Sequence, residues 1–269
     1  MTDESTTALI IRCPFRWGAA TDTGKVRAEN QDSFIVEPEA GLFLVADGMG
    51  GHRGGALAAN TVAEDLPVMI ENKLGELRSG GPRAVRSLLK KTISEQNRQL
   101  LLEGTSETGC REMGTTLVVM LLKDGRAYVA NLGDSRMYRY RKNRLRQLTK
   151  DHSVVSELVD EGKIKPEEAE NHAAAGQITG YVGMKETVTP FVRSFGLRKD
   201  DRLLLCTDGL TQMISDEEIA ETLRAHAEPQ AACEALVWAA NRAGGFDNVT
   251  VVVVDWAGRS NQQPRNISF

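Results

Sequence analysis

Two segments of the chain have nearly the same sequence, and each places an aspartate at the end of an apolar run. They read LFLVADGM at residues 42–49 and LLLCTDGL at residues 203–210. Each run has the length and composition of a buried strand, and the glycine after Asp47 or Asp208 lets the backbone turn or approach a ligand closely. We therefore expect both carboxylates to project from the rim of a sheet.

Two further aspartates flank strand-like runs in the same way. Asp134 comes just after the strand in VANLGDSR, and Asp247 just before the strand in GGFDNVTVVVV. Four carboxylates at one rim repel one another unless cations neutralise them. Oxygen ligands favour Mg²⁺ or Mn²⁺, and zinc is disfavoured because no His or Cys has ligand spacing. From spacing alone, chance remains an equal explanation, because 37 Asp and Glu residues supply many such arrangements.

Other chemistries that a glycine-rich or nucleophilic motif could indicate fit poorly. The stretch at residues 47–55 lacks the third glycine of a dinucleotide fingerprint, where Arg53 stands, and it lacks the Gly-Lys-Ser/Thr of a P-loop. A G-x-S-x-G serine and a kinase HRD set are both absent from the sequence. Serine hydrolase and kinase activities are therefore disfavoured.

The elements that position these aspartates follow from the apolar pattern. Helical spacing predicts helices within residues 56–66, 85–100 and 215–243, and Ser215 followed by Glu218 resembles a capping box. Because strands group together and helices come in pairs, the pattern predicts an α+β sandwich rather than a doubly wound parallel sheet. Six Val- and Leu-rich runs have strand length, at residues 42–46, 115–122, 127–131, 137–140, 203–206 and 249–254.

A third Asp-Gly pair has a structural interpretation. Asp124-Gly125 separates two strand-like runs, which is the signal of a two-residue hairpin turn.

The segment from residue 151 to about 192 differs from the rest, being first polar and helical and then glycine-rich. We interpret it as a mobile insertion, a flap beside the active site.

Composition limits the compartment and the partners. With 33 basic and 37 acidic residues the net charge is −4, which predicts neither a nucleic-acid nor a membrane partner. The four cysteines lack C-x-x-C spacing, the first residues do not resemble a signal peptide, and no apolar run reaches the roughly 18 residues that span a bilayer. We expect a cytoplasmic protein with reduced thiols.

Seven ordered motifs make the chain resemble the bacterial PPM (type 2C) family of metal-dependent Ser/Thr protein phosphatases, from about Trp17 to Trp256. The motifs are VRAENQD, VADGMGGHRGG, GTTLVV, VANLGDSRMYRY, LTKDHSVVSELVDEG, LLLCTDGL and GGFDNVTVVVV. The resemblance implies a four-layer α-β-β-α sandwich, with two antiparallel sheets flanked by helix pairs. It divides the chain into an N-terminal extension (1–16), a phosphatase domain (17–257) and a C-terminal tail (258–269).

The resemblance also implies a binuclear metal site. Asp47 matches the carboxylate that bridges two ions, Gly48 the residue whose backbone carbonyl binds one of them, and Asp208 and Asp247 the remaining ligands. Asp134 matches a ligand of a third, weaker site that Asp208 would share. The implied cofactor is Mn²⁺ or Mg²⁺, as two ions with a third site beside them.

Two further matches concern the substrate and the attacking water. Arg27 matches the arginine that binds the substrate phosphate, and Asp32 an acidic residue that reaches metal-bound water. Met49 stands where eukaryotic members place a histidine thought to protonate the leaving oxygen. His52 is a candidate for that proton transfer, and a purely local hydrogen bond at the start of a helix explains it equally well.

Two departures from the family pattern bear on metal binding and specificity. Gln31 replaces the usual acidic residue before Asp32, which removes one negative charge near the metals. Residues 173–184 of the flap lack the arginines often found there, which indicates an unusual substrate preference.

The implied function is hydrolysis of phosphoserine and phosphothreonine on proteins by a metal-activated bridging water. The implied partners are phosphorylated protein substrates and a cognate bacterial Ser/Thr kinase, with the chain acting as a monomer. The alternative is a catalytically weak phosphoprotein-binding regulatory module on the same fold. The presence of Asp47, Asp208, Asp247 and Arg27 together favours the enzyme, because a binding module has no physical reason to keep them.

Overall fold

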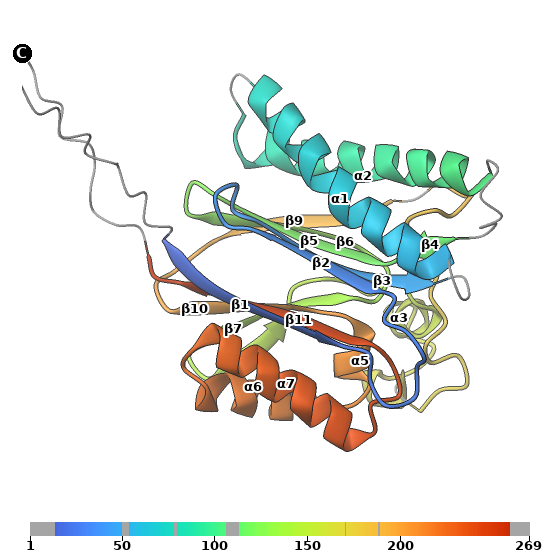
Figure 1. Cartoon of the computed structure of the whole chain (residues 1–269), viewed down its shortest axis with the longest axis vertical. Coiled ribbons are helices and arrows are strands. Elements are labelled where there is room, and N and C mark those ends of the chain that lie inside the picture. Colours follow the sequence, from blue (N-terminus) through green and yellow to red (C-terminus); the bar gives the residue numbers. More distant parts are fainter. Residues whose placement is uncertain are drawn as a thin grey trace, which may run out of the picture.

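Two antiparallel sheets stacked face to face form the centre of the molecule (Figure 1). The computed structural model describes residues 14–49, 54–77, 80–105, 113–169, 171–187 and 189–258. Within these residues the first sheet has the order β1-β11-β10-β7-β8. Its strands are β1 (Phe15–Asp22), β7 (Arg136–Arg141), β8 (Arg144–Gln147), β10 (Asp201–Cys206) and β11 (Val249–Trp256).

The second sheet has the order β2-β3-β5-β6-β9, with a short β4 paired to the end of β3. Antiparallel pairing and full burial of most β3, β5 and β6 side chains place this sheet against apolar layers on both faces. Its strands are β2 (Asp32–Glu37), β3 (Leu42–Met49), β4 (Gly114–Thr115), β5 (Leu117–Lys123), β6 (Arg126–Leu132) and β9 (Phe191–Gly196).

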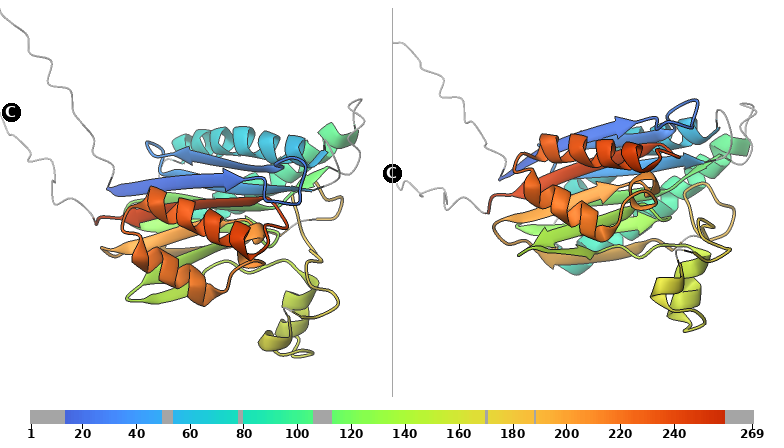
Figure 2. Two further views of the ribbon diagram at one scale, coloured as in Figure 1. Left: turned by 60° about the horizontal axis from the view of Figure 1, so that its bottom comes forward. Right: turned by 90° about the horizontal axis from the view of Figure 1, so that it is seen from below.

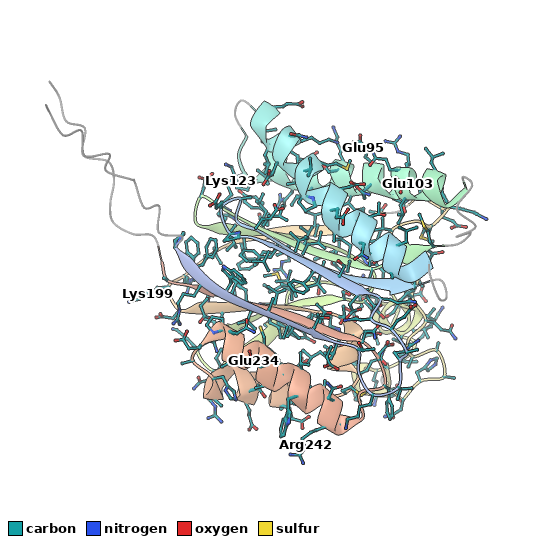
Figure 3. The ribbon with its side chains drawn as sticks, viewed as in Figure 1. Glu95, Glu103, Lys123, Lys199, Glu234 and Arg242 are labelled. Atoms are coloured by element: carbon teal, nitrogen blue, oxygen red, sulfur yellow. The ribbon has the colours of Figure 1, made fainter. Side chains whose placement is uncertain are left out.

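Helix pairs cover the two outer faces. The pair α1 (Gly54–Glu76) and α2 (Pro82–Thr105) lies on the second sheet, and α6 (Asp216–Ala225) and α7 (Pro229–Ala243) lie on the first (Figures 1 and 2). Apolar side chains fill three layers, one between the sheets and one under each helix pair. Charged side chains such as Arg242 point outward from the helices (Figure 3). The predicted four-layer α-β-β-α sandwich is confirmed.

Local signals in the sequence correspond to the turns and caps of this fold. Asp124 and Gly125 adopt positive φ angles of 53° and 72° and join β5 to β6, as a two-residue hairpin turn requires. Ser215 accepts a hydrogen bond from the backbone N–H of Glu218, whose side chain in turn caps α6. Both predictions are confirmed.

The flap contains two short helices, α3 (Val154–Asp160) and α4 (Pro166–Ala169). The interpretation of this segment as mobile does not hold around Val182, in its glycine-rich part. Val182 is fully buried against α1, α2 and the second sheet, and it exchanges backbone hydrogen bonds with Thr115. An apolar residue that reaches the core outweighs the conformational freedom of the neighbouring glycines.

One strand pair lies at both ends of the described chain. Phe15 at the start of β1 lies opposite Trp256 at the end of β11, and both side chains are buried. Most of the predicted N-terminal extension and C-terminal tail lies outside the described residues. None of the described helices combines the length and apolar character needed to cross a membrane.

Candidate active site

The predicted aspartates meet at one end of the sandwich, where β4, α5 (Asp208–Thr211) and the flap also lie (Figure 1). They surround a cleft of about 560 Å³. Its lining includes Arg27, Asp47, Gly48, Asp134, Asp208 and Asp247, together with Gly176 and Ile178 of the flap. The flap therefore lies beside the cleft, as predicted.

Asp47 and Gly48 are held by the strands around them. Asp47 was expected as the last residue of its strand, but β3 continues to Met49 because β4 pairs with its end. The Asp47 backbone N–H donates to Thr116 Oγ1 at 3.1 Å. A Cβ on Gly48 would lie 2.2 Å from the carbonyl oxygen of Gly55, so the close approach of α1 to β3 requires glycine here.

Asp32 lies directly opposite Asp47 on the neighbouring strand β2. Its Oδ2 accepts hydrogen bonds from Thr207 Oγ1 at 3.0 Å and from Thr250 Oγ1 at 2.6 Å. Burial raises the pKa of Asp32 to about 7, with the charge of Asp208 adding to the effect, while the two threonine hydroxyls oppose it. Asp32 thus joins the two sheets at the base of the site.

Asp208 is the first residue of α5, one residue after the end of β10, and its carboxyl group interacts electrostatically with that of Asp47. Burial raises the pKa of both groups, and the carboxylates around Asp47 raise its pKa further. Without cations, both aspartates therefore release their protons at a higher pH than isolated aspartates do.

Asp134 lies in the turn between β6 and β7, on the same cleft. Burial, and then the charges of Asp208 and Asp151, raise the pKa of Asp134 to about 7. Arg136 offsets part of this charge but is itself held by Asp151, with Nε 2.9 Å from Oδ2.

The donor set fits divalent cations. The Oδ1 atoms of Asp32 and Asp208 are buried and have no hydrogen-bond partner among the described residues. Clustered carboxylate oxygens are the ligands that Mg²⁺ and Mn²⁺ prefer. No group of three His, Cys, Asp or Glu side chains in the described part of the chain stands at the distances of a formed ion site. Asp247, one of the predicted ligands, is paired with Arg27.

That pair joins the cleft to the loop that carries Arg27. Arg27 Nη2 donates to Asp247 Oδ2 at 2.6 Å, and more than half of the Arg27 side chain remains exposed. The pairing raises the pKa of Arg27 above its ordinary value. A guanidinium at the mouth of the cleft can bind an incoming anion through directional N–H groups.

A match of the sequence to a family model identifies the family of this chain. Residues 24–237 match the family model described as "Protein phosphatase 2C". The chain belongs to the protein phosphatase 2C family.

Named relatives of this 2C-family chain agree with the assignment. The chain is 36% identical to the serine/threonine phosphatase Stp of Listeria welshimeri over 240 residues, 87% of this chain and 93% of that protein. The structure of Stp1 from Staphylococcus aureus superposes with a TM-score of 0.81 at 31% identity, covering 90% of this chain and 95% of that one. The catalytic domain of the phosphatase PstP, solved with two manganese ions, gives 0.72 at 37% identity, covering 90% and 97%. The predicted resemblance is confirmed.

The sequence singled out His52 as a candidate proton donor and Gln31 as a departure from the 2C-family pattern. His52 lies outside the described residues. Gln31, which stands in place of an acidic residue, donates from Nε2 to Glu29 Oε1 at 2.6 Å, and Glu29 lines the same cleft. A carboxylate therefore remains near this position, two residues earlier in the chain.

Sequence reasoning missed Asn248, which fixes the loop of this 2C-family site. Its Nδ2 donates to the carbonyls of Thr23 and Glu29, both at 2.9 Å, and its Oδ1 accepts from the Gln31 backbone N–H at 2.9 Å. The side chain is almost fully buried. The Asp-Asn pair before β11 was the available signal, because a buried amide beside a rim aspartate must find partners.

Proposed function

We propose that the protein hydrolyses phosphoserine and phosphothreonine in proteins with two divalent ions, Mn²⁺ or Mg²⁺, at the aspartate cluster. One observation carries the proposal. Asp47, Asp134 and Asp208 line one cleft, Asp32 lies beside Asp47 on the neighbouring strand, and burial raises the pKa of all four. The Oδ1 atoms of Asp32 and Asp208 have no hydrogen-bond partner in the described residues. The similar PstP domain, solved with two manganese ions, supports the use of two such ions.

In this proposal the carboxylates of Asp47, Asp208 and Asp247 and the backbone carbonyl of Gly48 would hold the two ions. Asp134 and Asp208 would provide ligands for a third. When bound, the ions lower the pKa of coordinated water and neutralise the phosphoryl oxygens. Asp32 accepts a hydrogen bond from the attacking water through its unpartnered Oδ1, while Thr207 and Thr250 hold its Oδ2.

Arg27 binds the phosphate of the substrate at the mouth of the cleft. The guanidinium is already directed across the cleft by Asp247, so a phosphate replaces a carboxylate as its partner. His52, for which the sequence analysis left two roles open, is proposed to donate the proton to the leaving serine or threonine oxygen.

The cellular setting follows from the same proposal. The substrates are phosphorylated proteins, and the enzyme acts as a cytoplasmic monomer that reverses a cognate Ser/Thr kinase in signal transduction. Cys206 and Cys233, both buried free thiols, agree with a reducing compartment. A phosphoprotein-binding module without activity is not favoured, because the named relatives are phosphatases.

Phosphate release from a phosphothreonine peptide tests the proposal. We expect turnover with Mn²⁺, none with EDTA, and a loss of at least about 10³-fold in kcat for Asp208→Asn at saturating Mn²⁺. The control is Asp65→Asn, an exposed aspartate on α1. Wild-type turnover in the Asp208 variant would overturn the assignment of the site.

A further inference from the structure

A cavity of about 570 Å³ at the edge of the first sheet is lined almost entirely by cations. Strands β7 and β8 and the turn between them form it, and β8 is the outermost strand of the sheet (Figure 2). We call it the arginine cleft, and its lining residues are Arg139, Arg141, Lys142, Arg144, Leu145 and Arg146.

Strand register places like charges side by side in the arginine cleft. Arg139 lies opposite Arg146, and Arg141 lies opposite Arg144. Directly opposed like charges destabilise a strand pair. Burial and then the neighbouring guanidinium groups, including that of Arg193 on β9, lower the pKa of Arg139. Solvent screens the exposed Arg144 and Arg146, while the half-buried Arg139 is screened less, so the register leaves a concentrated positive charge at this edge of the sheet.

The chain itself supplies few carboxylates that neutralise the positive charge of the arginine cleft. Asp201 pairs with Arg141. Among the described residues, no carboxylate forms an ion pair with Arg139, Arg144 or Arg146. The guanidinium of Arg139 lies 5.5 Å from the centre of the Phe195 ring, and its buried Nε atom has no hydrogen-bond partner there.

Arg202 shows how the same sheet treats a buried arginine that serves the fold. It forms two hydrogen bonds with Asp255, of 2.6 and 2.8 Å. Its remaining N–H groups donate to the carbonyls of Leu223, His226 and Ala227. Arg202 is thus fully neutralised within the chain, and the arginine cleft is not.

We propose that the arginine cleft binds an anionic segment of the protein substrate, one that carries further phosphates or clustered carboxylates. This inference rests on the proposed function, because it assigns a second contact to the same phosphoprotein. Guanidinium groups pair with both kinds of anion through two parallel N–H donors. The net charge of −4 disfavours a nucleic acid as the occupant.

Strand β7 connects the two sites. Arg136 at its start lines a pocket with Asp134 and Asp208, and Arg141 at its end lines the arginine cleft. Five residue steps at about 3.3 Å each separate these ends by roughly 17 Å. An extended substrate segment of about six residues covers that distance, so a phosphorylated residue at the aspartates leaves a more distant anionic group at the cleft.

Kinetics with tailed peptides test the second contact. One peptide carries phosphothreonine, a spacer of about six residues and a tail of glutamates, and its partner has a neutral tail. We expect the acidic tail to raise kcat/KM by about tenfold, mainly through KM, and the gain to shrink with added salt. Arg144→Glu/Arg146→Glu should abolish the gain and leave hydrolysis of a small aryl phosphate unchanged.

The matched control is Arg83→Glu/Arg98→Glu, which makes the same charge change at two exposed residues of α2. It should keep the gain. Absence of a gain in the wild type at spacers of about four to twelve residues, or equal losses in both double variants, would overturn the proposal.

Binding in EDTA separates this inference from the proposed function. The tail alone, without phosphothreonine, is labelled and titrated with metal-free protein, in one version with glutamates and in another with phosphoserines. We expect binding of both tails by the wild type and its loss in Arg144→Glu/Arg146→Glu. An oligonucleotide of equal charge that binds more tightly than either tail would overturn the peptide assignment. Failure to hydrolyse any phosphopeptide would contradict the proposed function and leave this binding test intact.

Discussion

Arg27 is the residue at which substrate binding and metal binding meet, because its partner Asp247 is a proposed metal ligand. Arg27→Ala should raise KM for phosphate esters by about tenfold or more, since it removes a charge-assisted contact to the phosphate. Mn²⁺ affinity should not fall, because Asp247 is freed. Steady-state kinetics and a Mn²⁺ titration measure both effects.

The controls for this residue are Arg27→Lys and Arg83→Ala. Lysine keeps the charge but lacks the planar pair of donors, so it should rescue KM only in part. Arg83 is exposed on α2 and should have no effect. An unchanged KM in Arg27→Ala would make Arg27 an ordinary surface residue.

Asn248 is a positioning residue, since it holds the loop that carries Arg27. Asn248→Ala removes three hydrogen bonds to residues 23–31 and should lower the free energy of unfolding by about 1–3 kcal/mol. It should also raise KM more than it lowers kcat. Asn60→Ala, at an exposed position of α1, is the control. A lower melting temperature with wild-type KM would limit Asn248 to a structural role.

Among the residues of the site, the charged ones could be predicted from the sequence, and their neutral hydrogen-bond partners could not. Asp47, Asp134, Asp208 and Asp247 stand out because an aspartate beside an apolar strand is unusual, and all four line one cleft. Asn248 had only the weak signal of the Asp-Asn pair before β11, and Thr207 and Thr250 had none. Their importance comes from hydrogen bonds to groups distant in the sequence, which appear only when the sheets are assembled.

At the scale of elements, the buried strands were predictable and the outer strands were not. Strands β3, β5, β10 and β11 are almost continuously apolar and buried. Strands β2 and β9 are half-buried, and β8 alternates exposed arginines with half-buried residues. Edge strands bury too little side chain to leave an apolar pattern.

The flap element should influence protein substrates more than small ones. Ala175 is exposed and lines a pocket with Asp134 and Arg136, beside the metal ligands. Ala175→Arg should change kcat/KM for phosphopeptides by about tenfold, because the new side chain reaches the peptide around the phosphate. Hydrolysis of a small aryl phosphate should change much less.

Ala225→Arg at the exposed end of α6 is the matched control for the flap variant. If Ala175→Arg altered both substrates equally, the segment would act on the metals or on folding rather than on selectivity. The anchoring of Val182 directs such substitutions to the first half of the flap.

For the whole molecule, the aspartate cluster makes stability depend on pH when metal is removed. Burial raises the pKa of Asp32 and Asp134 from 3.8 to about 7, so the folded chain binds more protons than the unfolded chain between these values. Stability in EDTA should therefore fall as pH rises from about 5.5 to 8, by at least about 1 kcal/mol. Thermal unfolding followed by circular dichroism measures the change.

Mn²⁺ should remove this pH dependence, because the ions neutralise the carboxylates that otherwise repel one another. Asp134→Asn should weaken the dependence in EDTA, since an amide carries no charge at either pH. A metal-free protein that gains stability between pH 5.5 and 8 would contradict the assigned burial of the cluster.

The proposed activity depends above all on the aspartates at the end of the sandwich holding the ions that the reaction uses. Anomalous scattering from crystals of the active, Mn²⁺-loaded protein tests this assignment. We expect two strong peaks in contact with Asp47, Asp208, Asp247 and the carbonyl oxygen of Gly48, and a weaker third peak beside Asp134. Crystals of active enzyme with no manganese against these carboxylates would contradict it.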